Sequence, residues 1–448
     1  MTINAPLARP DLVAGSPDRV KTAIAAAIGT CVENYDFIAY GTASALYFGA
    51  AFFPKENAAI GTLLAFATLA VGFVMRPLGG AIGGYLADRV GRKPILVAAM
   101  LVMGIATVLI GALPTYDQIG VIAPVLLIVV RIVQGLAFGA EWGSAVTMTY
   151  EHAPWRRRGF FASIPQSGNY VGIALASLMF VLSAHLPGDW AWRVPFLLSA
   201  VLIAAGIIVR LRLTESPEFV ETKAEGKVEK NPFLTVLRRD WRSILRVIGL
   251  RIVESFAYYL TATYLLSYIT TRHPGVQTIA LTSITVAAVL GIAVALLAGR
   301  LSDRLGRKPL YIGACSLAVL FGFPMYLLTN DGIPALVVTT FIIGITVIHA
   351  TLTGTQGALL TEQFPIGTRA SGASIGYQVA ASLSGFGPLL AGLLTAAMGW
   401  PGAAALYVIA ALIGLASIVS AKETWGPKQK AELDRIEAEH TGPGDTAR

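Results

Sequence analysis

Apolar segments long enough to cross a membrane occupy most of this chain. A bilayer core about 30 Å thick requires about 20 apolar residues in a helix. Backbone N–H and C=O groups find no partner in lipid, so a segment that crosses it must bond them internally, as a helix does. The chain is therefore predicted to be an all-α membrane protein with twelve transmembrane helices. The predicted runs are about 22–50, 60–85, 94–113, 119–148, 160–184 and 192–211, followed by 244–270, 277–299, 309–329, 333–358, 371–397 and 401–421.

The composition excludes several other classes of protein. Of the 448 residues, 55% are apolar and 13% are charged, against about 45–50% and about 25% in soluble domains. A soluble enzyme, a nucleic-acid binder and a disordered scaffold are therefore not expected. The two cysteines, Cys31 and Cys315, are too few for a disulfide framework or a zinc site. The chain also lacks the phosphate-binding loop of ATP-driven pumps. Its five histidines are scattered and no H-x-x-x-H or C-x-x-C motif occurs, so no metal and no cofactor other than a coupling proton are expected.

The distribution of Lys and Arg predicts the orientation in the membrane. If the first residue lies inside, three of the 34 basic residues fall in outer loops, three fall in helices, and all others fall on the inner side. Those six are Lys55, Arg193 and Arg272 in loops, and Arg76, Arg131 and Arg251 in helices. By the positive-inside rule both termini are cytoplasmic, in a multi-pass protein of the plasma membrane. The net charge of +8 then reflects topology, not a nucleic-acid partner.

An internal duplication divides the chain into halves. The segment Gly84–Pro94 (GYLADRVGRKP) recurs as Gly299–Pro309 (GRLSDRLGRKP). Four further residues recur at one common spacing, namely Glu151, Pro154, Arg158 and Ser163 as Glu362, Pro365, Arg369 and Ser374. Two similar six-helix bundles are therefore predicted, with a substrate site between them near the bilayer midplane. The predicted divisions are a cytoplasmic tail 1–21, a first bundle 22–213, a central cytoplasmic loop 214–242, a second bundle 243–421 and a cytoplasmic tail 422–448.

Each repeated loop is a candidate cytoplasmic gate. Its glycines permit a tight turn and close helix contact, and its Asp is suited to face the positive N-terminal end of a neighbouring helix. Its Arg residues can reach a carboxylate, so these contacts would close the inner side and break when it opens. The alternative is that the charges only anchor the topology. The candidate gate residues are Gly84, Asp88, Arg89, Gly91, Arg92 and Glu151, and in the second half Gly299, Asp303, Arg304, Gly306, Arg307 and Glu362.

The duplicated loop resembles the signature of the major facilitator superfamily. Further segments resemble its metabolite–proton symporter family, and the likeness covers the whole chain except both tails. These segments are Glu33–Tyr40, Phe73–Gly80, Arg131–Gly135 with Gly139–Gly143, Arg158–Gly168, and Trp192–Phe196 with Glu215–Phe219. The resemblance implies proton-driven uptake of small organic acids or zwitterionic metabolites. It also implies alternating access, in which the two bundles rock around a central site.

Two charged residues are predicted to lie near the membrane centre. Asp36 is about 14 residues from the inner end of the first helix, and Arg131 about 12 from the outer end of the fourth, or roughly 21 and 18 Å. An unpaired charge there costs at least ~2.5–3.5 kcal/mol. Contact with Arg131 favours an ionised Asp36, and loss of that contact favours protonation. Glu33, one turn earlier, is placed to share the proton. Asp36, Glu33 and Arg131 are thus candidate proton-coupling residues, and a permanent structural ion pair is the alternative.

The remaining arginines and several polar residues are candidates for substrate binding. Arg76 is suited either to bind a carboxylate with its planar fork or to pair with Glu33. Arg251 is either a second carboxylate anchor or the partner of Glu254. Three arginines favour an anionic substrate over a zwitterionic solute such as proline or betaine, because a quaternary amine favours an aromatic cage. The candidate substrate-binding residues are Arg76, Arg131, Arg251, Tyr40, Gln166, Asn169, Tyr258, Tyr377 and Gln378.

His349 and the C-terminal tail bear on pH dependence and on binding partners. His349 in the tenth helix either adds pH sensitivity or serves only as a hydrogen-bonding residue. The C-terminal tail lacks sustained heptads, so assembly through a coiled coil is not expected. The expected partners are therefore a small, anionic molecule and the lipid bilayer, with the monomer as the functional unit.

Overall fold

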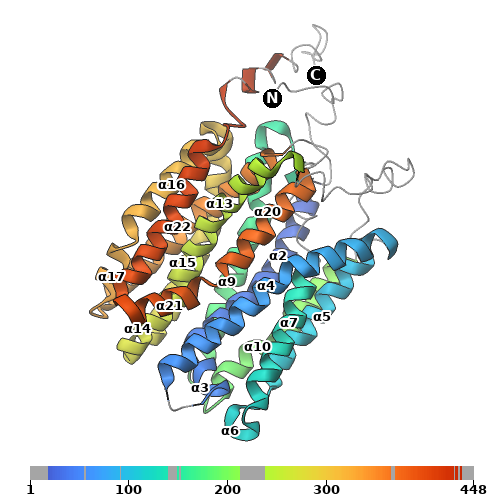
Figure 1. The fold of residues 1–448 in the computed structure, drawn as a ribbon. Helices are drawn as coiled ribbons and strands as arrows, with labels where there is room; N and C mark the ends of the chain where they lie inside the picture. The colour runs from blue at the N-terminus through green and yellow to red at the C-terminus, as the bar shows by residue number, and fades with distance from the viewer. Residues whose placement is uncertain are drawn as a thin grey trace.

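The computed structural model is a bundle of long helices (Figure 1). It describes residues 19–54, 57–90, 92–139, 149–150, 153–211, 238–364, 369–427, 429–431 and 434–435. Throughout these ranges the regular structure is helical, as predicted. Seven helices of the described part are long and apolar enough to cross a membrane. The number of twelve crossings stays a prediction.

The helices of the first half correspond to the first six predicted runs. They are α2 (Arg19–Leu46), α3 (Phe48–Phe52), α4 (Ala58–Val90), α5 (Arg92–Ala112), α6 (Tyr116–Ile119), α7 (Ile122–Gly139), the 3-10 turn η1 (Trp155–Arg157), α9 (Arg158–Ser183) and α10 (Trp190–Leu211). The fourth run was predicted to continue to about residue 148. Its last part and residues 214–237 of the predicted central loop lie outside the described residues, and the last two residues of that predicted loop belong to α13.

The helices of the second half correspond to the last six runs, but several runs are interrupted. They are α13 (Trp241–Tyr258), η2 (Tyr259–Tyr264), α14 (Leu265–Arg272), η3 (Pro274–Val276), α15 (Gln277–Leu305), α16 (Arg307–Phe321), α17 (Pro324–Thr329), α18 (Pro334–Phe341), η4 (Ile342–His349), α19 (Ala350–Glu362), α20 (Arg369–Ser384), α21 (Gly387–Met398) and α22 (Trp400–Ser420). Segments η2 and η4 are π-helical. Proline stands at the start of α17 and of α18, where its missing N–H breaks no helical hydrogen bond.

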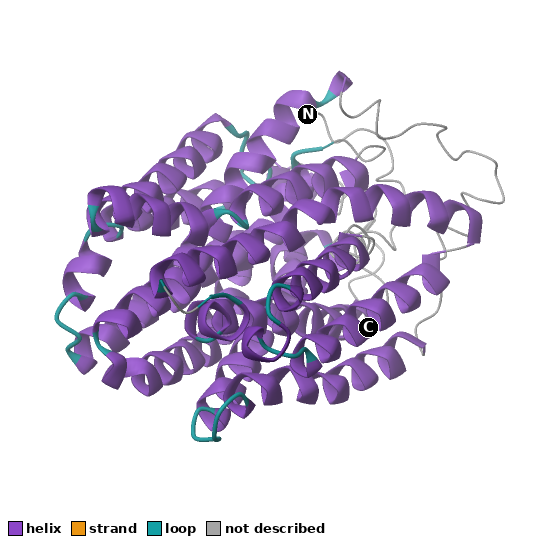
Figure 2. Cartoon of the chain, turned by 60° about the horizontal axis from the view of Figure 1, so that its bottom comes forward, coloured by secondary structure: helices purple, strands orange, loops and turns teal. Residues whose placement is uncertain are grey.

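The helices pack side by side, and their connecting loops lie at the ends of the bundle (Figures 1 and 2). Helix α9 of the first half contacts α15 and α19 of the second, while α4 contacts α20 and α21. The outer surface carries large apolar side chains such as Val121, Val201 and Leu320, which are 69%, 68% and 72% exposed. Such a surface is suited to lipid, where apolar side chains need no burial against protein.

The packing of α7 on α4 depends on small residues. A Cβ added at Gly135 would lie 2.2 Å from the carbonyl oxygen of Gly72, and one at Gly139 would lie 1.9 Å from that of Arg76. These separations are far below van der Waals contact, so a larger side chain forces the two helices apart. Glycines four residues apart on one helix face allow such close approach in membrane proteins.

We therefore expect Gly135→Val to destabilise the first half. Overpacking of this kind costs about 1–3 kcal/mol or more, so the melting temperature of the purified protein in detergent should fall by several degrees. Gly313→Ala on α16 is the matched control, because no atom lies within 4 Å of an added Cβ there. Equal melting temperatures for Gly135→Val and wild type would show that α4 and α7 do not pack as described.

Candidate functional site

Asp36 of α2 is fully enclosed and held by neutral donors. Its side chain is 3% exposed, and the Nε2 atom of Gln134 on α7 lies 2.8 Å from each carboxyl oxygen. The hydroxyl of Thr107 on α5 donates a hydrogen bond to Oδ1. The carboxyl group thus accepts hydrogen bonds from two helices, α5 and α7, that are distant from α2 in sequence. The donors on both oxygens satisfy the hydrogen-bonding capacity of this buried carboxyl group.

Arg131 lies beside this group, but the predicted direct contact between Arg131 and Asp36 is wrong. Its Nη1 atom donates to Oε1 of Gln134 over 2.7 Å, and the Nε2 atom of the same amide donates to Asp36. Gln134 therefore stands between the charges and passes the interaction from one to the other. The physical reason is spacing: residues 131 and 134 share one face of α7, so the amide fills the gap between guanidinium and carboxylate.

The rest of the Arg131 guanidinium rests on aromatic rings and leaves two donors unused. Its central carbon lies 3.9 Å from the ring centroid of Tyr40 and 4.7 Å from that of Phe37. Within the described residues, Nε and Nη2 of Arg131 are buried and have no hydrogen-bond partner. The hydroxyl of Tyr40 is bonded to Thr68 over 2.6 Å. Tyr40 therefore supports Arg131 through its ring. A buried guanidinium with spare donors is suited to receive an anion.

Arg76 of α4 lies among three phenyl rings of the first half. Its guanidinium carbon is 3.5 Å from the ring centroid of Phe138, 4.6 Å from that of Phe37 and 4.8 Å from that of Phe73. Its Nε atom has no hydrogen-bond partner among the described residues. Glu33 is buried on α2 and lies within Coulombic range of Arg76. Both predicted roles of Arg76, as a carboxylate receptor and as a partner of Glu33, stay open.

Arg251 is paired within its own half. It forms an ion pair with Glu254 one turn later on α13, and its Nη2 donates to the hydroxyl of Tyr377 on α20 over 2.7 Å. Of the two predicted roles, the pairing with Glu254 is the one present in this conformation. Glu254 also accepts hydrogen bonds from Thr353 and His349, so its charge is matched inside the second bundle.

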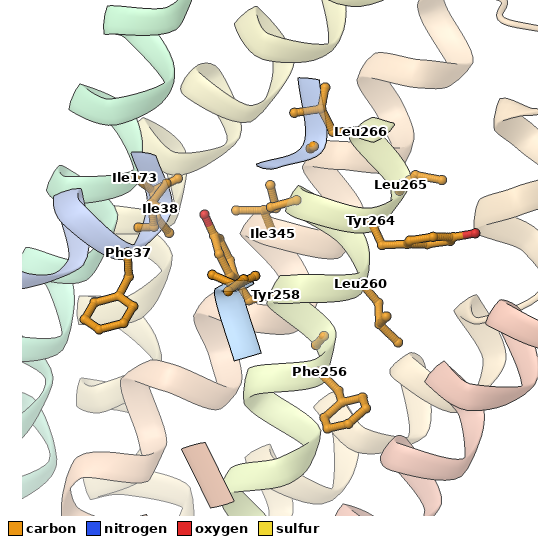
Figure 3. Close-up of a cluster of buried hydrophobic side chains, with 14 of the residues drawn as sticks. Phe37, Ile38, Ile173, Phe256, Tyr258, Leu260, Tyr264, Leu265, Leu266 and Ile345 are labelled. Carbon is orange, nitrogen blue, oxygen red and sulfur yellow. The ribbon is translucent and has the colours of Figure 1, made fainter. Parts of the chain in front are cut away.

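The other candidate substrate-binding residues differ in their surroundings. Gln378 of α20 is buried with both amide atoms unpartnered among the described residues, which marks it as a group able to bind a ligand. Gln166 is buried and Asn169 half-buried, both on α9. Figure 3 shows the side chain of Tyr258 pointing away from its own helix toward Phe37, Ile38 and Ile173 of α2 and α9. Its ring packs against Tyr259 and His349.

The candidate gate of the second half joins the two bundles. Both carboxyl oxygens of Asp303 accept hydrogen bonds from the first backbone N–H groups of α9, at Gly159 over 2.8 Å and Phe160 over 2.9 Å. Gly299 lies where an added Cβ would be 2.5 Å from the Cβ of Ser163. The negative side chain thus meets the positive end of a helix dipole, and glycine lets α15 and α9 approach.

Arg307 is the cation of this gate. It is 0% exposed and pairs with Asp303 over 2.8 Å and with Glu362 over 3.3 Å. Gly306 before it has φ +100°, a conformation that other residues rarely adopt, and this turn directs the chain into α16. Arg304 does not join the cluster, because its side chain is exposed. On a helix that ends at Leu305, residue 304 faces away from residue 303.

The gate of the first half falls largely outside the described part of the chain. Gly91 and Glu151 are not described. Helices α4 and α5 contain Gly84, Asp88, Arg89 and Arg92, but nothing is described of how these four residues are packed. Glu141, in the motif Gly139–Gly143, is likewise not described.

Several residues of these clusters escaped the sequence-based prediction. Gln134 and Thr107 are neutral, so they do not stand out as charged residues in membrane helices do. Gln134 nevertheless lies within the motif that begins at Arg131. Glu423 and Trp425 follow the last helix. Glu423 accepts hydrogen bonds from the backbone N–H of Arg307 over 3.0 Å, and Trp425 donates to the carbonyl of Asp303 over 2.8 Å. A polar tail carries no periodic signal, so only folding reveals that it covers the gate.

Buried charges in membrane helices are rare and mark functional sites in membrane proteins. The sequence matches the Major Facilitator Superfamily over residues 27–386. The chain belongs to this superfamily, whose fold it shares with a solved xylose transporter, XylE from E. coli, in a partially occluded inward-open conformation. That match has a TM-score of 0.69 at 18% identity and covers 92% of this chain and 99% of the other.

Curated relatives are similar over nearly their whole length. The inner membrane metabolite transport protein YhjE of Escherichia coli K12 is 38% identical over 411 residues, which cover 89% of this chain and 93% of that protein. The shikimate transporter of the same strain is 36% identical and covers 90% and 94%. Its proline/betaine transporter is 33% identical and covers 90% and 83%. The predicted superfamily is therefore confirmed, and the chain is a transporter.

Proposed function

We propose that this protein is a proton-coupled symporter that takes up a small carboxylate by alternating access. Asp36 receives the coupling proton, Glu33 assists it, and Arg131 with Arg76 receives the substrate carboxylate. The proton enters with the substrate, and both termini face the cytoplasm. The anionic substrate and the functional monomer are part of the same proposal.

The observation that carries the proposal is the amide relay between Arg131 and Asp36. Among the described residues no cation forms an ion pair with Asp36, so its charge depends on the orientation of Gln134 and on Arg131 behind it. A substrate carboxylate that binds the two spare donors of Arg131 draws positive charge away from this relay. The carboxyl of Asp36 then loses electrostatic support in a buried place and takes up a proton. Substrate and proton thereby bind together.

The zwitterionic solute is the second candidate, and it has specific support. One relative is named a proline/betaine transporter and is 33% identical over 426 residues. A zwitterion also carries a carboxylate, so the same guanidinium groups serve it. The rings of Phe138 and Tyr40, however, are covered by the guanidinium groups of Arg76 and Arg131. This leaves those ring faces less available for a quaternary amine, which favours the simple carboxylate.

We expect shikimate and other small carboxylates to be accumulated by the purified protein in liposomes under an inward proton gradient. Radiolabelled shikimate, proline and betaine are the probes, each measured with and without the gradient. Gradient-dependent uptake of a carboxylate, and of neither zwitterion, supports the first candidate. Uptake of proline or betaine alone contradicts the first candidate and supports the second. Uptake that is the same with and without the gradient contradicts proton coupling.

Arg76→Lys should markedly weaken the binding of an anionic substrate. The lysine ammonium is a point charge, whereas the arginine guanidinium is a planar group with two parallel donors. Loss of one charge-assisted hydrogen bond costs about 1.5–3 kcal/mol, which is roughly a tenfold to hundredfold rise in the half-saturating concentration. Uptake kinetics over a range of substrate concentrations measure this. An unchanged half-saturating concentration would remove Arg76 from the site and favour its pairing with Glu33.

A further inference from the structure

A second buried polar cluster joins the two halves and has no part in the proposal above. Glu254 of α13 and His349 of η4 are each 2% exposed. The Nε2 atom of His349 lies 3.2 Å from Oε1 of Glu254. Its Nδ1 atom lies 2.7 Å from the hydroxyl of Tyr170. Tyr170 is fully buried and belongs to α9 of the first half. One imidazole therefore links a carboxylate of the second bundle to a phenol of the first.

The cluster satisfies its hydrogen bonds with a neutral imidazole. In that state Nε2–H donates to Glu254, and Nδ1 accepts from the hydroxyl of Tyr170. The hydroxyl of Thr353 lies 3.0 Å from Oε1 of Glu254 and 2.8 Å from the carbonyl oxygen of His349, and it donates to either of them. Every donor of this arrangement has an acceptor.

The cluster also satisfies its hydrogen bonds after a proton is added. Both imidazole nitrogens of a protonated His349 are donors, so Tyr170 must accept from Nδ1. Its own hydroxyl proton then turns to Oγ1 of Thr353, which lies 3.2 Å away. Thr353 keeps donating to the carbonyl of His349. The rotation of one hydroxyl group is the only rearrangement required, and no buried polar atom is orphaned by the change.

Charges of both signs lie near the imidazole. Glu254 attracts the added proton, while Arg251 repels it and is itself paired with Glu254. Helix α18 contributes no titratable group, and those of α15 and α19 stand at their far ends. The titratable groups on the other elements packed against η4 are Arg242, Arg246, Arg251, Glu254 and Tyr258 of α13, Tyr259 and Tyr264 of η2, and Arg307, Lys308, Tyr311 and Cys315 of α16. Tyr170 of α9 contacts His349 through its hydroxyl group.

The backbone at this cluster is irregular on both helices that build it. The π-helical segment η4 ends at His349, and the π-helical segment η2 begins five residues after Glu254. The two segments contact one another. Such π-helical insertions occur often at functional sites. Here they accompany the one imidazole that bridges the bundles within the described residues.

We infer that His349, with Glu254 and Tyr170, is a second proton-binding site that is complete only while α9 and η4 are in contact. This inference rests on the proposed proton-coupled transport. Hydrogen bonds from a charged donor are stronger than those from a neutral one, so the added proton strengthens the contact between the bundles. By reciprocity, the joined bundles bind the proton more tightly than the separated bundles do. Rocking of the bundles then releases it.

The test is a titration of the histidine side chains by nitrogen NMR. The full-length protein carries five histidines, so labelling them alone gives a simple spectrum in liposomes, and the signal missing in His349→Gln identifies His349. Tyr170→Phe and Thr353→Val should each lower its proton affinity about tenfold, because each removes an acceptor that the protonated state uses. Thr353→Val nearly preserves shape and serves where Tyr170→Phe does not fold.

The control is Tyr326→Phe, because the hydroxyl of Tyr326 is buried in the same half without a hydrogen-bond partner among the described residues. It should leave the titration of His349 unchanged. A His349 signal that does not titrate, or that titrates equally in Thr353→Val and wild type, overturns the inference. The readout needs no substrate. Failure of uptake under a proton gradient would therefore contradict the proposed function, and failure of this titration would contradict only the second site.

Discussion

Asp36→Asn abolishes accumulation driven by a proton gradient while downhill exchange of substrate persists. Asparagine has the shape of aspartate but cannot take up a proton, so the substrate crosses without a driving ion. Uptake of one proton with one singly charged carboxylate moves no net charge, so each unit of pH gradient contributes about 1.4 kcal/mol, which is about a tenfold concentration ratio. In the variant this ratio should fall to about one. Uptake and counterflow, both measured in liposomes, separate the two activities.

The matched control for this prediction is Asp117→Asn. Asp117 lies on α6 of the same half and its side chain is exposed, so its replacement should leave accumulation unchanged. Accumulation by Asp36→Asn equal to that of wild type would contradict the assignment and move the coupling proton to another acid, with Glu33 as the next residue to replace. Loss of exchange together with accumulation would instead indicate that Asp36 supports the structure of the site.

Arg307→Ala opens the gate of the second half. The guanidinium is 0% exposed and contacts two carboxylates, those of Asp303 and Glu362. Removing one partner of a buried ion pair costs about 3–5 kcal/mol, because the remaining charges stay buried without compensation. The balance between closed and open forms should therefore shift by more than a hundredfold. We expect uptake to fall to background and the melting temperature to drop.

Arg304→Ala is the matched control for the gate. Arg304 precedes Arg307 in the same loop, but its side chain is exposed, and exposed charges contribute little. Wild-type uptake and melting are expected for this variant. If Arg304→Ala were as damaging as Arg307→Ala, the loop would act through its total charge and not through the buried cluster.

The candidate site could be predicted from the sequence only in part. Asp36, Arg76 and Arg131 stand out because charge in a membrane helix is costly, and this cost depends on the sequence alone. The sequence does not identify Gln134 as a site residue in the same way, because a neutral amide in a membrane helix has many possible structural roles. Its importance comes from its place between Arg131 and Asp36, and that place depends on how α2 and α7 pack.

The same limit applies to the second half. Sequence spacing indicates that Arg251 and Glu254 share a helix face, but it does not tell whether the pair is closed or open to substrate. The contact of Tyr170 with His349 joins residues 179 positions apart. No periodicity reports a contact of that kind, because it depends on how one bundle lies against the other.

The sequence by itself determined the helical fold, the duplication and the residues that carry buried charge. These properties follow from the cost of placing backbone and charge in lipid, which is local and needs no knowledge of neighbours. The tertiary structure alone decided which charges meet directly, which meet through Gln134, and which loop arginine enters the gate. Such choices depend on distances of a few ångströms between helices remote in sequence, and only packing sets those distances.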